Sequence, residues 1–149
     1  AGYEPSGNRL AMINLPQGGL IINDTYNANP LSMAAALETA RELAAGRRIV
    51  AVLGDMFELG EYEQQGHLEV GRKVALSGVD LLVTIGTRAE TITKGARETG
   101  MTDKQIAHFI DLAECHEYLR ENLSKQDVIL FKASRGMKFE LIIDKWLEK

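Results

Sequence analysis

LIINDTYNANPLSM, residues 20–33, contains a short apolar run, a polar loop and the start of a helical pattern. A continuous apolar run with polar boundaries is typical of a strand that is covered on both faces. Pro30 suits the first turn of a helix, because a backbone N–H at that position would have no partner within the helix. The stretch therefore predicts a strand, a loop and a helix in this order.

The same alternation continues along the chain. Further strands are expected at residues 49–53, 81–85 and 127–131, with a weaker one at 106–110. Helical spacing of apolar side chains predicts helices at residues 30–44, 64–76, 89–98, 111–123 and 138–147. Strands that alternate with helices form right-handed crossovers and a mostly parallel sheet. We expect an α/β fold of the Rossmann-like, three-layer type.

The opening segment is expected to differ from this pattern. Residues 9–14 are joined to the strand at residue 20 through a turn that contains Pro16, Gly18 and Gly19. A glycine-rich turn between two apolar runs predicts a hairpin, and hence one antiparallel edge strand. Residues 1–8 are expected to be an interdomain linker within a chain, 1–149, that otherwise forms one domain.

The composition fits a folded domain of ordinary size. The chain has 149 residues, of which 45% are hydrophobic and 26% charged, so a disordered chain is excluded. Its net charge of -4 argues against nucleic acid or an anionic membrane as the partner, since both require a basic surface. No apolar run is long enough to span a bilayer, and the single cysteine, Cys115, fits a reducing compartment. We expect a cytoplasmic monomer without membrane insertion.

Polar segments follow four of the expected strands. Ligands of open α/β sheets bind beyond the carboxyl ends of the strands, so these segments are the candidate sites. Residues 23–30 combine carboxamides, a carboxylate, a hydroxyl and a phenol, and residues 53–60 contain two carboxylates. A guanidinium, which suits a carboxylate ligand, occurs in residues 86–88. Residues 132–137 carry lysine, serine and arginine on one turn that would favour an anion.

Each candidate residue also has a simpler interpretation. Asn29, directly before Pro30, suits a helix N-cap. Glu58 suits a solvated loop, and His67 suits a cap or a packing position near a helix start. Arg88 is equally suited to the surface of the helix that follows it. For residues 23–30, the density of polar groups at the expected strand end favours a site. For His67, the cap or packing position is favoured over a base.

Several self-sufficient catalytic motifs are absent from the sequence. It contains no G-x-x-x-x-G-K-S/T phosphate loop, no G-x-G-x-x-G fingerprint, no zinc-spaced Cys/His set and no serine nucleophile elbow. We therefore expect no metal site and no catalytic residue in this domain alone. The chain is expected to supply one half of a site whose other half lies elsewhere.

Three segments resemble motifs of the MurF ligases, a branch of the Mur ligase family. NDTYNANPLSM, residues 23–33, resembles their NDxYNANPxSM, and VLGDMFELG, residues 52–60, resembles VLGDMxELG. KASRGMK, residues 132–138, resembles KGSRGMK, with Ala133 where glycine is common. The order and spacing of the motifs fit over essentially the whole chain.

The resemblance implies an activity for the complete protein. MurF ligases use ATP to join D-alanyl-D-alanine to UDP-N-acetylmuramoyl-tripeptide through an acyl phosphate, in cytoplasmic peptidoglycan precursor synthesis. Their N-terminal domain holds the UDP-sugar, and their central domain holds the phosphate loop and most of the Mg²⁺ site. This chain would be the C-terminal domain, which closes over ATP, helps to bind the dipeptide and is inactive by itself.

The resemblance also implies residue roles. Arg9 would reach the ATP phosphates, Asp24 would bind the ribose hydroxyls, and Tyr26 and Asn27 would line the nucleotide. Substrate contacts are implied for Asn29, Thr87, Arg88, Ser134 and Arg135. The motifs also include Asp55, Glu58 and His67, to which no defined contact is assigned.

Two alternative functions stay open on the sequence alone. One is a related amide ligase of the folylpolyglutamate synthetase type, which would prefer glutamate to the dipeptide. The other is a stand-alone nucleotide-binding module, since a Rossmann-like fold hosts many functions. Residues 26–30 and 54–56 favour the MurF-type ligase over the folylpolyglutamate synthetase type.

Overall fold

The computed structural model describes residues 10–24 and 27–148. Within these ranges, six strands form one sheet in the order β1-β2-β6-β3-β4-β5. From β2 to β5 all neighbouring strands are parallel, and β1 is antiparallel to β2. The strands are β1 Ala11–Asn14, β2 Leu20–Asn23, β3 Ile49–Gly54, β4 Leu81–Ile85, β5 Ile106–Phe109 and β6 Val128–Lys132.

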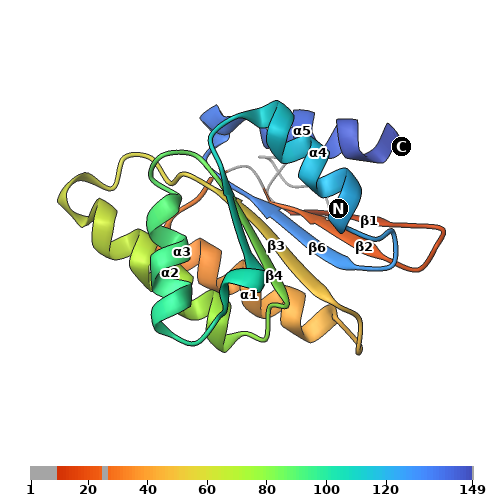
Figure 1. Ribbon diagram of the computed structural model, residues 1–149, viewed down its shortest axis with the longest axis horizontal. Coiled ribbons are helices and arrows are strands. Elements are labelled where there is room, and N and C mark those ends of the chain that lie inside the picture. The colour runs from red at the N-terminus through yellow and green to blue at the C-terminus, as the bar shows by residue number, and fades with distance from the viewer. Residues whose placement is uncertain (1–9, 25–26, 149) are drawn as a thin grey trace, which may run out of the picture.

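Helices cover both faces of this sheet (Figure 1). On one face lie α1 Pro30–Leu43, α2 Glu63–Leu76 and α3 Glu90–Glu98. On the other lie α4 Leu112–Asn122 and α5 Phe139–Glu148. Single turns of 3-10 helix occur at η1 Gly60–Tyr62, η2 Asp103–Gln105 and η3 Arg135–Met137. The predicted α/β three-layer sandwich is confirmed.

Alternating side chains of the strands divide the core into two clusters. In β3, Ala51 and Leu53 pack with α1, α2 and α3, whereas Val50 and Val52 pack with α4 and α5. Successive side chains of a strand point to opposite faces, so an apolar run of this kind requires cover on both sides. The buried runs that predicted the strands therefore also account for the three layers.

The first two strands form the predicted hairpin. Ala11 pairs with Asn23 and Asn14 with Leu20, and the turn is closed by a 2.9 Å hydrogen bond from Leu15 N to Gly19 O. Because β1 runs against β2, the start of β1 lies at the same edge of the sheet as the carboxyl end of β2. Residue 9, which the sequence placed in this strand, lies outside the described residues.

Two boundaries differ from the predicted ones in a way that affects the site. The last strand ends at Lys132, one residue later than expected, so this lysine belongs to the sheet. The helix expected from residue 138 starts at Phe139, because Lys138 adopts a left-handed conformation with φ 55°.

Among the described residues, no helix is both long and apolar enough to cross a membrane.

Candidate functional site

The carboxyl ends of β2, β6, β3 and β4 lie at one edge of the sheet, and the candidate residues follow them. Lys132, the last residue of β6, is only 1% exposed. Its Nζ lies 3.0 Å from Asp24 Oδ2 and donates hydrogen bonds to the carbonyl oxygens of Asn27, at 2.8 Å, and Asp24, at 3.4 Å. Burial lowers the pKa of Lys132, and the Asp24 carboxylate opposes this shift. A buried ammonium is tolerated here because it is paired and hydrogen-bonded.

A cavity of about 390 Å³ opens beside this ion pair. Its volume is in the range of small-molecule sites. It is lined by Leu10, Asp24, Asn27, Lys132 and the α1 residues Ser32, Ala35, Ala36 and Thr39. The structure therefore places Asp24 and Asn27, two of the four residues expected to bind ATP, on one cavity. Arg9 and Tyr26, the other two, lie outside the described residues.

Asn29 caps the helix that follows the loop. Its side-chain oxygen accepts a 2.8 Å hydrogen bond from Ser32 N, and Ser32 Oγ accepts one of 3.1 Å from Asn29 N. This reciprocal pair is a capping box, which satisfies backbone donors at the start of α1. The simpler interpretation of Asn29 is thus confirmed, and the cap fixes where the loop ends.

Asp55 joins the loops that follow β3, β4 and β6. Its side chain is buried, Oδ1 accepts a 2.7 Å hydrogen bond from Ala89 N, and Oδ2 lies 3.6 Å from Arg88 Nη1. Its backbone oxygen accepts a 3.0 Å hydrogen bond from Ser134 N. A Cβ on Gly86, which has φ +120°, would lie 2.3 Å from Asp55 Oδ1. Glycine at this position therefore makes room for the carboxylate.

Arg88 is held by three groups at the same edge. Its Nε donates to Glu63 Oε1 at 3.0 Å, its Nη1 lies near Asp55, and its guanidinium stacks over the Phe57 ring at 5.0 Å from the centroid. Thr87 lines a separate cavity of about 350 Å³ with residues of α2 and α3. The structure therefore does not bring Thr87 and Arg88 to the cavity that contains Asp24.

His67 has a structural role in the loop that follows β3. Its fully buried ring accepts a 3.1 Å hydrogen bond from Met56 N at Nε2, and Nδ1 lies 2.7 Å from Glu63 O. Because a backbone N–H only donates and a carbonyl only accepts, the proton must be on Nδ1 and the ring is neutral. Both nitrogens are therefore occupied, and His67 is not available as a base.

Ser134 and Arg135 line a second cavity, of about 340 Å³, at the carboxyl edge. Ser134 Oγ accepts a 2.8 Å hydrogen bond from Phe57 N, which ties the turn after β6 to the loop after β3. The remaining lining residues are Asn27, Phe57, Glu58 and Gly136. Asn27 lines both this cavity and the one beside Asp24, so the two cavities adjoin.

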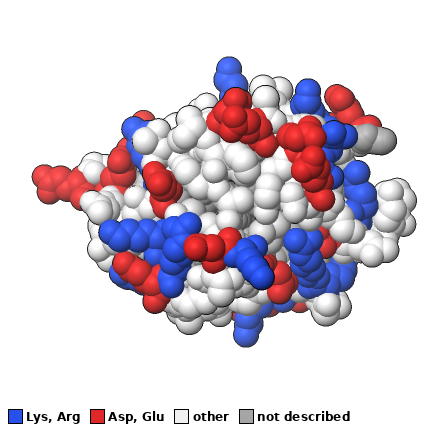
Figure 2. Space-filling model, in the orientation of Figure 1, with Lys and Arg blue, Asp and Glu red and all other residues white. Residues whose placement is uncertain are grey.

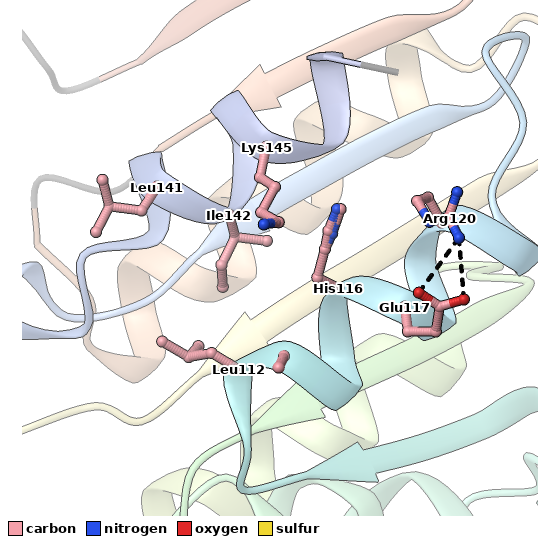
Figure 3. A pocket seen from close by; sticks show the side chains of 8 residues that line it. Leu112, His116, Glu117, Arg120, Leu141, Ile142 and Lys145 are labelled. Atoms are coloured by element: carbon pink, nitrogen blue, oxygen red, sulfur yellow. Dashed lines mark hydrogen bonds and ion pairs between the residues drawn. The ribbon is translucent and has the colours of Figure 1, made fainter.

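A further cavity lies away from the predicted residues, between α4 and α5 (Figure 3). It has a volume of about 630 Å³, and Figure 3 shows the Glu117–Arg120 ion pair, with distances of 3.1 and 3.3 Å, on its α4 side. Its walls are formed by Leu112, Ala113, His116, Glu117, Arg120, Leu141, Ile142 and Lys145. None of these residues follows from the sequence motifs.

Figure 2 shows acidic and basic side chains interspersed on the viewed face, without a continuous basic patch. Across residues 10–24 and 27–148, no group of three or more His, Cys, Asp or Glu side chains is arranged to hold a metal ion.

Sequence reasoning missed Lys132 and Phe57 as individual site residues. The turn at residues 132–137 was predicted to favour an anion, but the lysine points to a carboxylate and two carbonyls of this chain instead. The available signal was its place at the end of an apolar run, where a strand that extends by one residue buries it. No pattern in the sequence indicated Phe57.

The sequence of the chain is similar to those of known proteins. Residues 8–135 match the profile of the family "Mur ligase, glutamate ligase domain". The UDP-N-acetylmuramoyl-tripeptide--D-alanyl-D-alanine ligase of Bacillus subtilis is 38% identical over 148 residues, which are 99% of this chain and 32% of that protein. The chain thus spans about a third of the length of this curated relative.

Solved structures of MurF ligases are also similar to this chain. A MurF structure from Acinetobacter baumannii aligns with a TM-score of 0.83 and 32% identity, covering 95% of this chain and 31% of that one. MurF from Thermotoga maritima, in complex with ADP, aligns with a TM-score of 0.77 and 28% identity, covering 99% of this chain and 32% of that one. The extent of the family match and the shared fold lead to one assignment: the chain belongs to the Mur ligase family.

Proposed function

We propose that this chain is the C-terminal domain of an ATP-dependent ligase that joins D-alanyl-D-alanine to UDP-N-acetylmuramoyl-tripeptide. The observation that carries the proposal is the pair of adjoining cavities at the carboxyl edge, which share Asn27. One presents a carboxylate suited to hydroxyls, and the other a hydroxyl and a guanidinium suited to a carboxylate. The relatives named for this reaction, and the ADP-bound neighbour, support it.

The cavity beside Asp24 is proposed to take the nucleotide. The Asp24 carboxylate would accept hydrogen bonds from the ribose hydroxyls, and Asn27 would line the same cavity. The motif resemblance adds Arg9 for the phosphates and Tyr26 for the nucleotide. The motif resemblance also implies that Mg²⁺ would be held mainly by the central domain of the complete ligase.

The cavity beside Ser134 is proposed to take the incoming dipeptide. Its carboxylate would pair with the Arg135 guanidinium, which binds such groups through two parallel hydrogen bonds, and Ser134 would border the same space. Substrate contacts by Thr87 and Arg88 stay predictions. Arg88 would have to leave Glu63 and Asp55 to make one.

In the proposed reaction, ATP phosphorylates the tripeptide carboxylate and ADP leaves. The dipeptide amine then attacks the acyl phosphate, so that an amide bond forms and inorganic phosphate is released. An acyl phosphate is sensitive to hydrolysis, and closure of this domain over the reactants would exclude water. The N-terminal and central domains are the expected partners, and a monomeric, cytoplasmic enzyme of peptidoglycan precursor synthesis is the expected setting.

The test is phosphate release from ATP by the complete ligase that contains this domain, given UDP-N-acetylmuramoyl-tripeptide. We expect release to depend on D-alanyl-D-alanine and to fall by roughly 100-fold in Asp24→Ala, since the nucleotide would lose its ribose contacts. Asp80→Ala, at the opposite edge of the sheet, is the matched control and should retain activity. Release that requires glutamate instead would contradict the substrate assignment. Tight ATP binding by a natural protein that consists of this domain alone would contradict the ligase assignment.

A further inference from the structure

Lys132 is an unusual residue to find in the interior. Lysine is almost never fully buried unless it is paired, because its ammonium loses its hydration. Here the ammonium has three N–H donors and three acceptors within reach, namely Asp24 Oδ2, Asp24 O and Asn27 O. All three acceptors belong to the segment that follows β2. The lysine therefore serves that segment and no other part of the described chain.

Lys132 and Asp24 differ in how firmly their backbones are held. Lys132 lies in a central strand, with Leu53 of β3 as its register partner. Asp24 is the first residue after β2, and its N–H donates a 3.0 Å hydrogen bond to Phe131 O. Residues 27–29 belong to no strand, and α1 begins at Pro30. The ion pair thus fixes the start of a loop to the rigid end of a neighbouring strand.

We propose that Lys132 is a positioning residue for the nucleotide, a role that rests on the function proposed above for Asp24. Lys132 holds Asp24 Oδ2, so that Oδ1, which accepts no hydrogen bond from another described residue, is presented to the ribose hydroxyls. The same contact offsets the charge of the carboxylate. A lone carboxylate at this position would repel a polyphosphate, whereas a paired one accepts hydrogen bonds without that repulsion.

The test compares ATP with 2′-deoxy-ATP and 3′-deoxy-ATP, bound to the complete ligase. The unsubstituted protein should prefer ATP to the deoxy analogues by roughly tenfold, the value of about one hydrogen bond. In Lys132→Met the affinity for ATP should fall by roughly tenfold, and the preference over the deoxy analogues should shrink towards unity. A merely structural lysine would weaken all three nucleotides alike and leave their ratio unchanged, which would overturn the proposal.

Two further variants keep the test decisive. Lys104→Met removes an exposed lysine before β5, at the opposite edge, and should retain both affinity and ratio. If Lys132→Met alone does not fold, Asp24→Asn/Lys132→Met replaces it, because the double variant removes both charges and leaves no unpaired, partly buried carboxylate. If Lys132 acts through Asp24, the double variant should bind ATP no more weakly than Asp24→Asn. A further tenfold loss would show that Lys132 acts independently, which would contradict the proposal.

The outcome for the unsubstituted protein separates this inference from the function on which it rests. If that protein binds no ATP, or does not discriminate between ATP and its deoxy analogues, the role proposed for Asp24 fails. If it discriminates and Lys132→Met discriminates equally well, only the positioning role of Lys132 fails.

Discussion

The two edges of the sheet each carry a buried aspartate, but the two aspartates differ in what surrounds them. At the amino edge, Asp127 Oδ2 accepts a 2.8 Å hydrogen bond from Ser124 N and pairs with Arg48 at 3.0 Å. At the carboxyl edge, Asp55 binds Ala89 N and Arg88, and its backbone is joined to Ser134. The side chains of Asp127 and Asp55 are only 5% and 7% exposed. Only the partners of Asp55 extend to a residue that lines a candidate ligand cavity.

The comparison shows that burial and pairing of a charge do not by themselves mark a functional site. Asp127 joins chain segments at the strand starts, and this contribution is to stability. Asp55 joins three loops whose neighbouring side chains face a cavity, so the same chemistry also sets the shape of that cavity. Substitutions at the two edges should therefore separate stability from activity.

Gly86→Ala should give the largest loss of stability. The new Cβ would overlap the Asp55 carboxylate, and the residue would keep a φ of +120° that alanine disfavours. We expect a loss of about 4 kcal/mol in the free energy of unfolding, from strain and overpacking together. Gly78→Ala is the matched control, because Gly78 has φ +77° with open space around its Cβ position. It should lose only about 1 kcal/mol in denaturant titrations. Equal losses would mean that the Asp55 contact does not matter.

Asp55→Ala should be the next largest change and should affect both properties. It leaves the buried Ala89 N–H without an acceptor, which costs about 2 kcal/mol. Release of the three loops should also lower the activity of the complete ligase by roughly 100-fold. Asp127→Ala should lose similar stability in urea unfolding but retain the rate of phosphate release below the unfolding transition. A comparable activity loss in both variants would remove the distinction between the edges.

Cys115 lies in α4, between the two edges of the sheet, and lines neither of the two cavities at the carboxyl edge. A variant at this position therefore serves as a reference for the variants at the edges. Burial raises the pKa of its thiol to about 12, from an ordinary value of 9.0. Between these values the unfolded chain has already lost the proton that the folded chain retains, so stability falls as the pH rises above 9. The difference between wild type and Cys115→Ala should change by about 1 kcal/mol from pH 9 to 10, because the unfolded thiol is already half ionised at pH 9. Parallel pH profiles for the two proteins would contradict the burial of the thiol.

Asp80→Asn should have the smallest effect. Asp80 Oδ2 accepts a 2.8 Å hydrogen bond from Ile49 N at the amino edge, and an asparagine oxygen can accept the same bond. We expect a change of less than about 0.5 kcal/mol in stability and none in activity. A measurable loss of phosphate release in Asp80→Asn would show that the amino edge also contributes to function.

The layers and strand directions followed from the sequence because they depend on local patterns. Apolar runs such as residues 49–53 indicate strands covered on both faces, and the glycine-rich turn at residues 16–19 indicated the antiparallel hairpin. The motif residues also lie at one edge of the sheet, because parallel strands end together. The roles implied for individual side chains stay predictions.

The contacts within the site could not be predicted, because they join residues that are far apart in the sequence. Lys132 and Asp24 are 108 positions apart, and Ala89 and Asp55 are 34 apart. Whether Lys132 meets Asp24 depends on the register of β2 against β6 and on the one residue by which β6 is extended. Local spacing records neither quantity. It also left both interpretations of His67 open until its two backbone partners were known.

The direction of β1 has a mechanical consequence. Because this strand is antiparallel, Leu10 lies at the carboxyl edge and lines the same cavity as Asp24. The polypeptide that precedes Leu10 is therefore attached beside this cavity. A pivot at that attachment point would have a short lever arm to the cavity and a long one to the amino edge. Rotation of the domain as a rigid body would then move the amino edge through a wide arc, while the cavity beside Asp24 would shift only slightly.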